Sequence, residues 1–196
     1  MPSSMFDSAI FRDGFGTAAM RAIFCDEAYV SHCVAVEVAL AQAEAKVGVI
    51  PAAAAADIAR LAKGDGLDLA KLKTETDNVG YPIVGIVHQM QKQCGEAGRY
   101  IHWGATTQDI MDCAVVLQMR DGLGLVAADL AALDATLTAL ARKHRDTVMA
   151  GRTHLQQALP TTFGHKVAVW LSMIHRHRQR LEQLQPRVLV SQFGGA

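Results

Sequence analysis

The chain has 196 residues, enough for one or two domains with a hydrophobic core. Its 19 acidic and 19 basic residues cancel, so no net field draws it to nucleic acid or to a membrane, and local donors must hold any anionic substrate. The four cysteines form no C-x-x-C pair, so we expect free thiols in a cytoplasmic protein rather than a metal site or disulfides. No signal peptide is apparent, and Asp129 and Asp134 make the stretch 122–139 a poor membrane span.

Helical patterns follow one another along the chain, and no alternating strand is apparent. Thr17 is a candidate N-cap for a helix that reaches about Lys46. Pro51 suits the first turn of a short alanine-rich helix, and residues 68–74 predict a weaker helix or turn. The next helix starts near residues 80–82 and carries apolar residues at helical spacing: Ile83, Ile86, Val87 and Met90.

Two long helices are predicted in the second half of the chain. One follows the polar loop 102–109 and reaches about Arg145, with apolar residues at steps of three and four: Leu123, Val126, Leu130, Leu133, Leu137 and Leu140. The other covers about 161–184, and Pro186 should end or kink it. Two such helices cannot bury both apolar stripes alone, so we predict an all-α bundle with further helices outside this sequence or from other chains.

The loop 102–109 is a candidate anion-binding site. Its small residues let a ligand approach the amides at a helix N-terminus, where the helix dipole favours negative charge. Thr106, Thr107 and Gln108 could add side-chain donors to a carboxylate. The same residue types are also typical of a plain helix cap, and the loop by itself does not separate the two interpretations.

A second polar loop, residues 151–157, contains His154, whose intrinsic pKa near neutrality suits proton transfer. A surface or structural histidine is the alternative. The run from His175 to Arg180 is interpreted as the solvated face of the last helix. Nucleotide-binding loops, the dinucleotide fingerprint, the H-E-x-x-H zinc motif and the G-x-S-x-G elbow do not occur in this sequence.

These loops resemble known signatures. Residues 101–112, Ile-His-Trp-Gly-Ala-Thr-Thr-Gln-Asp-Ile-Met-Asp, resemble the first signature region of the fumarase/aspartase superfamily, in a form similar to that of 3-carboxy-cis,cis-muconate cycloisomerases. Residues 151–166 resemble the second region. The segments 76–82 and 4–7 also resemble cycloisomerases, so the resemblance covers essentially the whole chain.

The resemblance implies an all-α fold in which residues 1–110 form a small N-terminal helical domain. Residues 111–196 would then begin the central helical bundle, and the rest of the bundle and the C-terminal domain would lie beyond this sequence. It further implies a homotetramer with each active site drawn from three chains. No metal or cofactor, no nucleic acid and no membrane are implied, and the ligand is a small dicarboxylate or tricarboxylate.

The resemblance also implies a reaction in which a proton is transferred next to a carboxylate while a group adds to or leaves the neighbouring carbon. His154 would be the general acid or an orienting group. The residues that the resemblance places at the substrate are Asn78, His102, Thr106, Thr107, Gln108, Arg152, Thr153 and Gln156. The activity that the resemblance favours is lactonisation of 3-carboxy-cis,cis-muconate in protocatechuate degradation.

Two departures keep other activities open. Adenylosuccinate lyases carry a histidine in the region of Asp77-Asn78-Val79, which counts against that activity, whereas bacterial cycloisomerases tend to carry tryptophan where this chain has His154. A lyase that eliminates an amine to give fumarate, or an epimerase, is therefore the alternative. The family's third signature, with the catalytic serine, is expected beyond residue 196, so the 196-residue chain is expected to be inactive alone. A non-catalytic helical assembly module is the third hypothesis.

Overall fold

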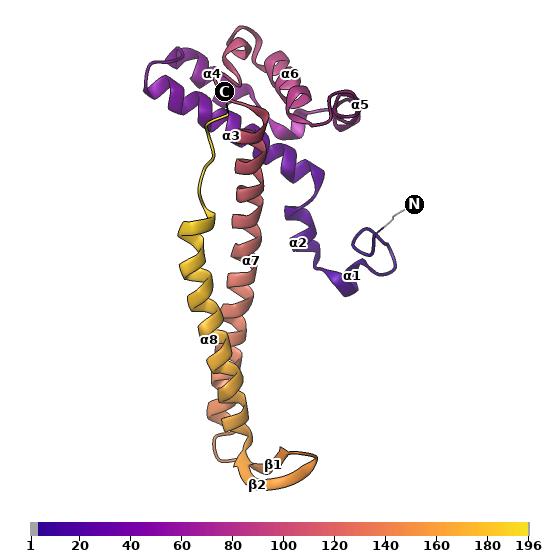
Figure 1. The fold of residues 1–196 in the computed structure, drawn as a ribbon, viewed down its shortest axis with the longest axis vertical. Helices are drawn as coiled ribbons and strands as arrows, with labels where there is room; N and C mark the ends of the chain where they lie inside the picture. The colour runs from indigo at the N-terminus through magenta and orange to yellow at the C-terminus, as the bar shows by residue number, and fades with distance from the viewer. Residues whose placement is uncertain (1–3, 196) are drawn as a thin grey trace. The chain divides into compact units, whose positions relative to one another are not determined.

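A computed structural model describes residues 4–195, and these residues are mostly helical (Figure 1). The elements in chain order are α1 (Arg12–Phe15), α2 (Ala18–Ile23), α3 (Asp26–Lys46), α4 (Ala52–Leu61), η1 (Gly64–Gly66), α5 (Leu69–Val79), α6 (Ile83–Cys94), η2 (Gly95–Tyr100), α7 (Thr107–Lys143), β1 (Val148–Thr153), β2 (Gln156–Thr162) and α8 (Phe163–Val188). The helical fold class predicted from the sequence is confirmed.

The described residues fall into two units. The first consists of residues 4–122 with 189–195, and the second of residues 123–188. The domain boundary predicted near residue 110 concerns the longer protein and stays a prediction.

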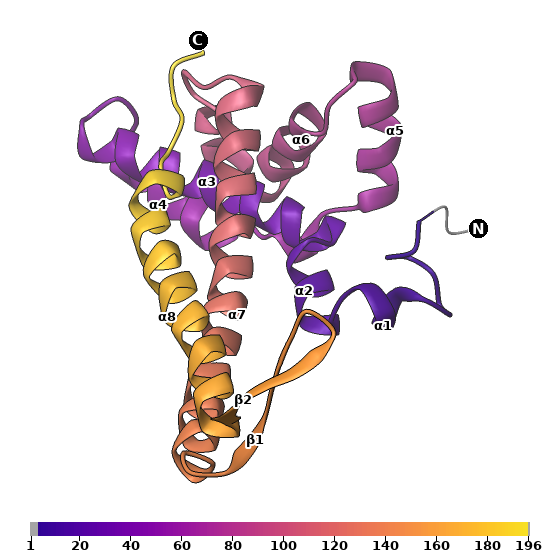
Figure 2. The same cartoon turned by 60° about the horizontal axis from the view of Figure 1, so that its bottom comes forward.

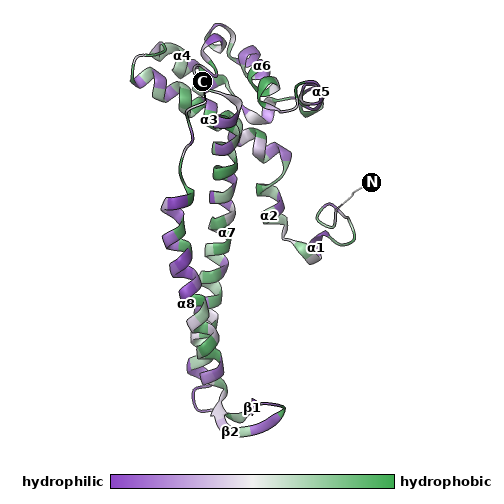
Figure 3. Ribbon diagram, viewed as in Figure 1, coloured by the Kyte–Doolittle hydropathy of each residue, from purple (hydrophilic) through white to green (hydrophobic). Residues whose placement is uncertain are grey.

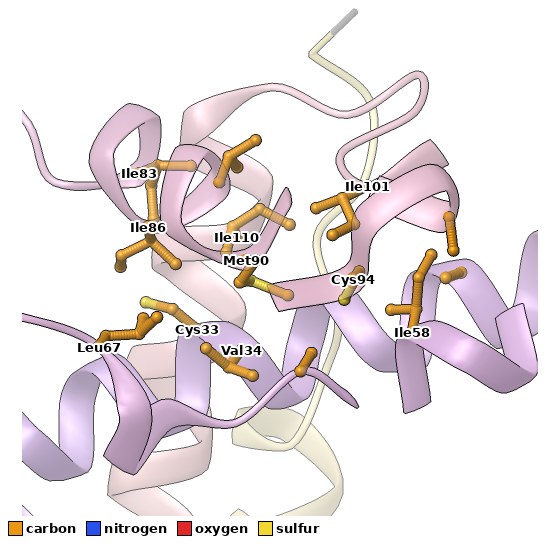
Figure 4. Close-up of a cluster of buried hydrophobic side chains, with 14 of the residues drawn as sticks. Cys33, Val34, Ile58, Leu67, Ile83, Ile86, Met90, Cys94, Ile101 and Ile110 are labelled. Atoms are coloured by element: carbon orange, nitrogen blue, oxygen red, sulfur yellow. The ribbon is translucent and has the colours of Figure 1, made fainter. Parts of the chain in front are cut away.

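The hydrophobic core of the first unit lies between α3, α4, α6 and the start of α7 (Figure 4). The spacing predicted for α6 is confirmed, because Ile83, Ile86, Val87 and Met90 are all buried. Cys33 and Val34 from α3, Ile58 from α4 and Ile110 from α7 complete the centre of this cluster. This core holds the N-terminal end of α7 against α3.

Several predicted helix boundaries were wrong. The helix expected from Thr17 to Lys46 is broken at Cys25, whose extended backbone separates α2 from α3. The weak element expected at 68–74 is the full helix α5, which Asp68 caps by accepting hydrogen bonds from two backbone N–H groups. Pro186 does not end α8, which continues to Val188.

The second unit contains a two-stranded antiparallel sheet, so the prediction of no strand was wrong. Figure 2 shows this β1–β2 hairpin, which connects the end of α7 to the start of α8. The hairpin gave no alternating pattern because its residues are mostly exposed and have no buried face. Gly151 lies at an irregularity between the strands, where a Cβ atom would come within 2.5 Å of the Leu159 carbonyl oxygen.

In the second unit, α7 and α8 run side by side in opposite directions (Figures 1 and 2). Asp134 on α7 pairs with Arg178 at 2.7 Å and with His175 at 3.0 Å. The basic run on α8 is therefore not purely a solvated face, as the sequence had suggested, since two of its members bind α7. The carboxyl pKa of Asp134 is lowered, mainly by its hydrogen bond to Arg178.

Figure 3 shows that α7 is rich in apolar residues, and many apolar side chains on the long helices are exposed. Of the predicted seam, Leu137 is buried, whereas Val126 and Leu133 are about two-fifths exposed. By length and composition alone α7 could cross a membrane, and 6% of its most apolar window is buried. Further exposed apolar residues lie on both helices: Val115, Met119, Val169, Trp170, Met173 and Leu184.

Candidate active site

The residues 102–108, which we call the donor loop, are held at both ends by buried carboxylates. Glu37 on α3 is fully buried and accepts a hydrogen bond from the backbone N–H of His102 at 3.1 Å. Its other oxygen lies 2.6 Å from Nδ1 of the same histidine. Asp109, 1% exposed, accepts a hydrogen bond from the backbone N–H of Thr106 at 3.0 Å. The conformation of the donor loop is thus fixed by groups on two helices.

The backbone of the donor loop makes sharp turns that most residues avoid. His102 has φ 64° and Gly104 has φ 66°. Glycine adopts such angles freely, whereas a histidine does so at a cost of about 1 kcal/mol or more. The two hydrogen bonds that Glu37 accepts from His102 offset that cost and keep the turn in place.

The donor loop ends in the first turn of α7, so Thr107 and Gln108 are helical rather than in a loop as predicted. Asp109 reaches back to the N–H of Thr106 as the acid of a capping box does. Backbone N–H groups in the first turn of a helix have no intrahelical partner, and together with the helix dipole they favour an anion. The arrangement therefore suits a carboxylate, although part of it also serves as a cap.

The three predicted side-chain donors of the donor loop differ in their availability. Thr106 and Thr107 are half-buried, and Gln108 is exposed. The amide of Gln108 already donates to Asp112 at 2.5 Å. The amide nitrogen carries a second hydrogen, so Gln108 can donate to Asp112 and to a ligand at the same time.

The imidazole of His102 has a raised pKa. The hydrogen bond to Glu37 is the main cause, burial opposes it, and the charges of Glu37 and Asp109 add to it. The positively charged form of this histidine is thus favoured at the donor loop, where the chain as a whole supplies no net positive charge.

The segment 189–195 passes over the donor loop. Asp109 accepts a hydrogen bond from the backbone N–H of Gly194 at 3.1 Å, and Cys113 accepts one from the N–H of Gln192 at 3.3 Å. A Cβ atom at Gly195 would lie 2.0 Å from the methyl group of Thr106, so glycine is needed for this approach. Neither this segment nor Glu37 was among the predicted site residues.

An apolar pocket of about 740 Å³ adjoins the donor loop between α3 and the segment 189–195. Its lining includes Trp103, Ile110, Phe193 and the side chain of Glu44. One Glu44 oxygen is buried without a hydrogen-bond partner among the described residues, and burial raises the carboxyl pKa. Glu44 makes no hydrogen bond to the donor loop in the part of the chain that the structure describes.

Asn78 lies in the last turn of α5 and is exposed. Gly80 ends this helix with φ 95°. Within residues 4–195, no hydrogen bond joins Asn78 to the donor loop. Its predicted place in a substrate pocket stays a prediction.

The other predicted site residues lie at the tip of the β1–β2 hairpin. Thr153 pairs with Gln156, and Arg152 pairs with Gln157. His154 and Leu155 form the turn with φ 44° and 60°, positive values that are typical of tight hairpin turns but uncommon for these residue types. Residues 152–157 line a recess of about 490 Å³ and are all exposed.

The structure thus brings the predicted residues together in two groups. His102, Thr106, Thr107 and Gln108 gather at the donor loop in the first unit, and Arg152 to Gln156 gather at the hairpin tip in the second. Among the described residues, no cluster of three or more metal-ligating side chains is present.

A family described as Lyase matches residues 15–196. N-acetyl-S-(2-succino)cysteine lyase of Dickeya dadantii is 43% identical over all of this chain and 43% of its own length. Adenylosuccinate lyase of Pyrococcus abyssi is 42% identical over 93% of this chain and 40% of its own.

A solved structure is similar as well. That of the 3-carboxy-cis,cis-muconate lactonizing enzyme from Pseudomonas putida matches with a TM-score of 0.89 and 43% identity, over 96% of this chain and 44% of that one. The chain therefore spans less than half the length of these relatives.

Proposed function

Because the chain belongs to the Lyase family of the fumarase/aspartase superfamily, we propose that the full-length protein is an enzyme that adds or eliminates a group beside a substrate carboxylate. The donor loop is the observation that carries this proposal. It presents half-buried threonines and the first-turn amides of α7 in a conformation fixed by Glu37 and Asp109. Such fixed donors stabilise the charge that builds up when a proton leaves the carbon next to a carboxylate.

The finer proposal is a cofactor-independent 3-carboxy-cis,cis-muconate cycloisomerase. In this reaction an internal carboxylate oxygen adds across a double bond to close the lactone, and a proton is delivered to the neighbouring carbon. Thr106, Thr107 and Gln108 would hold a carboxylate, and His154 would deliver the proton or orient the substrate. The segment Asp77-Asn78-Val79 and the similarity to the lactonizing enzyme support this choice.

A lyase is the second candidate, and His154 is the observation that favours it. A histidine at this place resembles the eliminating lyases, and two relatives named as lyases match the chain over most or all of its length. Such an enzyme would release an amine or a thiol from a succinyl group and form fumarate. An epimerase of the same fold is a further variant of this candidate.

Ultraviolet absorbance of the full-length protein with 3-carboxy-cis,cis-muconate tests the first candidate. We expect the diene absorbance to fall as the substrate is consumed. The rate of this fall should be strongly reduced in His154→Ala. It should be unchanged in His177→Ala, which alters an exposed histidine on α8. Fumarate release from adenylosuccinate or N-acetyl-S-(2-succino)cysteine, without muconate turnover, would instead establish the lyase. No turnover of any of these substrates would favour the non-catalytic assembly module.

We also propose that the full-length protein is a cytoplasmic homotetramer with active sites shared between chains. The exposed apolar residues of α7 and α8 support this assembly, because neighbouring helices would bury them. Asp129 and Asp134 on α7 argue against lipid as the covering medium. Light scattering should give four chains per particle, and a monomer would refute the proposal.

A further inference from the structure

Glu37 is a buried charged group that sequence reasoning did not connect with the site. It lies on the apolar helix α3 with its side chain fully buried, and it is paired with His102, 65 residues further along the chain. Burial of a carboxylate costs folding free energy unless the group is hydrogen-bonded and paired. A fully buried glutamate therefore indicates a specific role.

The contacts of Glu37 define both the backbone and the ring of His102. One carboxylate oxygen accepts a hydrogen bond from the backbone N–H of His102, and the other is hydrogen-bonded to Nδ1 of its ring. The pair therefore holds a left-handed residue and sets the orientation of its imidazole at once. The second ring nitrogen, Nε2, makes no hydrogen bond to any residue between 4 and 195, and the side chain is 21% exposed.

We propose that Glu37 is a positioning residue that holds the imidazolium of His102 as a charged donor, through Nε2, for a substrate carboxylate at the donor loop. This inference rests on the proposed function of the same loop. It assigns Glu37 no contact with the substrate, because the residue is fully buried behind His102.

Charge and hydrogen bonding agree with this role. An imidazolium donates from both nitrogens, so one donor can serve Glu37 while the other serves a ligand. The acidic groups that face His102 are Glu37 from α3 and Asp109 from α7, and both raise the pKa of the imidazole. Because that pKa is raised, the charged donor persists above the ordinary histidine value of about 6.5 and is lost as the pH rises further.

The variant Glu37→Gln in the full-length protein tests the proposal. The amide keeps the size of the side chain but removes the charge, so the imidazole pKa of His102 should fall. Asp121→Asn is the matched control, because Asp121 is an acid that faces a different histidine, His32, at 3.3 Å. The pKa is measured by NMR of protein labelled at the histidine ring, with His102→Gln to assign the signal.

Ligand affinity provides the second measurement. Binding of fumarate and of citrate is followed by calorimetry between about pH 6 and 9. We expect Glu37→Gln to weaken binding about 10- to 100-fold near pH 8 and much less near pH 6, since loss of one charge-assisted hydrogen bond corresponds to that factor. Asp121→Asn should bind like the unaltered protein at every pH.

Three outcomes would overturn the proposal. They are an unchanged His102 titration in Glu37→Gln, an equal loss of affinity at all pH values, and no binding of either anion by the unaltered protein. Absence of turnover on every candidate substrate, with pH-dependent anion binding as expected, would refute the proposed reaction and leave the role of Glu37 supported.

Discussion

Asp109 offers a direct test of how the donor loop is held. Each of its two carboxylate oxygens accepts one backbone N–H, from Thr106 at 3.0 Å and from Gly194 at 3.1 Å. The variant Asp109→Asn keeps one acceptor but turns an NH₂ group toward the other N–H. One of the two chain segments must then lose its hydrogen bond.

The magnitude follows from the burial of the site. A hydrogen bond to a charged group contributes about 1.5–3 kcal/mol, and removal of a negative charge from the first turn of a helix costs about 0.3–1 kcal/mol more. The local opening free energy of this region should therefore fall by about 2–4 kcal/mol. Amide protons of residues 102–109 and 189–195 would exchange about 30- to 1000-fold faster, because 1.4 kcal/mol corresponds to a factor of ten.

Hydrogen exchange followed by mass spectrometry measures this change in the full-length protein. Asp112→Asn is the matched control, because Asp112 lies on the same helix, is only half-buried and bonds to the exposed amide of Gln108. Its effect should stay within about 0.5 kcal/mol. Equal exchange in the two variants would show that the Asp109 contacts do not hold the segments together.

Three further predictions concern packing, pH and binding. Gly164→Ala should lower the melting temperature, because a Cβ atom there would lie 2.7 Å from backbone atoms at the end of α7, whereas Gly124→Ala, in open space, should raise it. The stabilisation from Asp134 should be complete above about pH 4 and lost as the pH falls below it, since Arg178 lowers the carboxyl pKa. The difference in melting temperature between the unaltered protein and Asp134→Asn should therefore shrink in acid. A difference that stays constant with pH would contradict the pairing. Thr107→Val should raise the KM of the full-length enzyme about tenfold with an unchanged melting temperature, and an unchanged KM would remove Thr107 from the site.

Sequence reasoning succeeded where one face of an element packs on the core of the same chain. The spacing of Ile83, Ile86 and Met90 predicted a buried helix face, and all three residues are buried. The seam of α7 was equally regular, yet Val126 and Leu133 remain exposed. A periodic stripe predicts that a helix will be covered, but it carries no information on which chain covers it.

The parts of the site that were missed depend on contacts over long sequence separations. Glu37 looks like an ordinary polar position on α3, although an acid flanked on both sides by apolar residues was a usable signal. Its partner His102 is 65 residues away, and no local rule connects the two. The hairpin around His154 was missed for another reason, since a strand without a buried face has no alternation to detect.

The bond between Gly194 and Asp109 has a consequence for the order of folding. The two residues are 85 positions apart, so this contact closes a loop that contains almost all of α7, the hairpin and α8. Contacts at such separation carry a larger loop-closure entropy and form late, whereas α3, α4 and α6 can associate early. On the ribosome the N-terminal core would be complete well before residue 194 is synthesised. The donor loop would then acquire its final rigidity last, when the returning chain reaches Asp109.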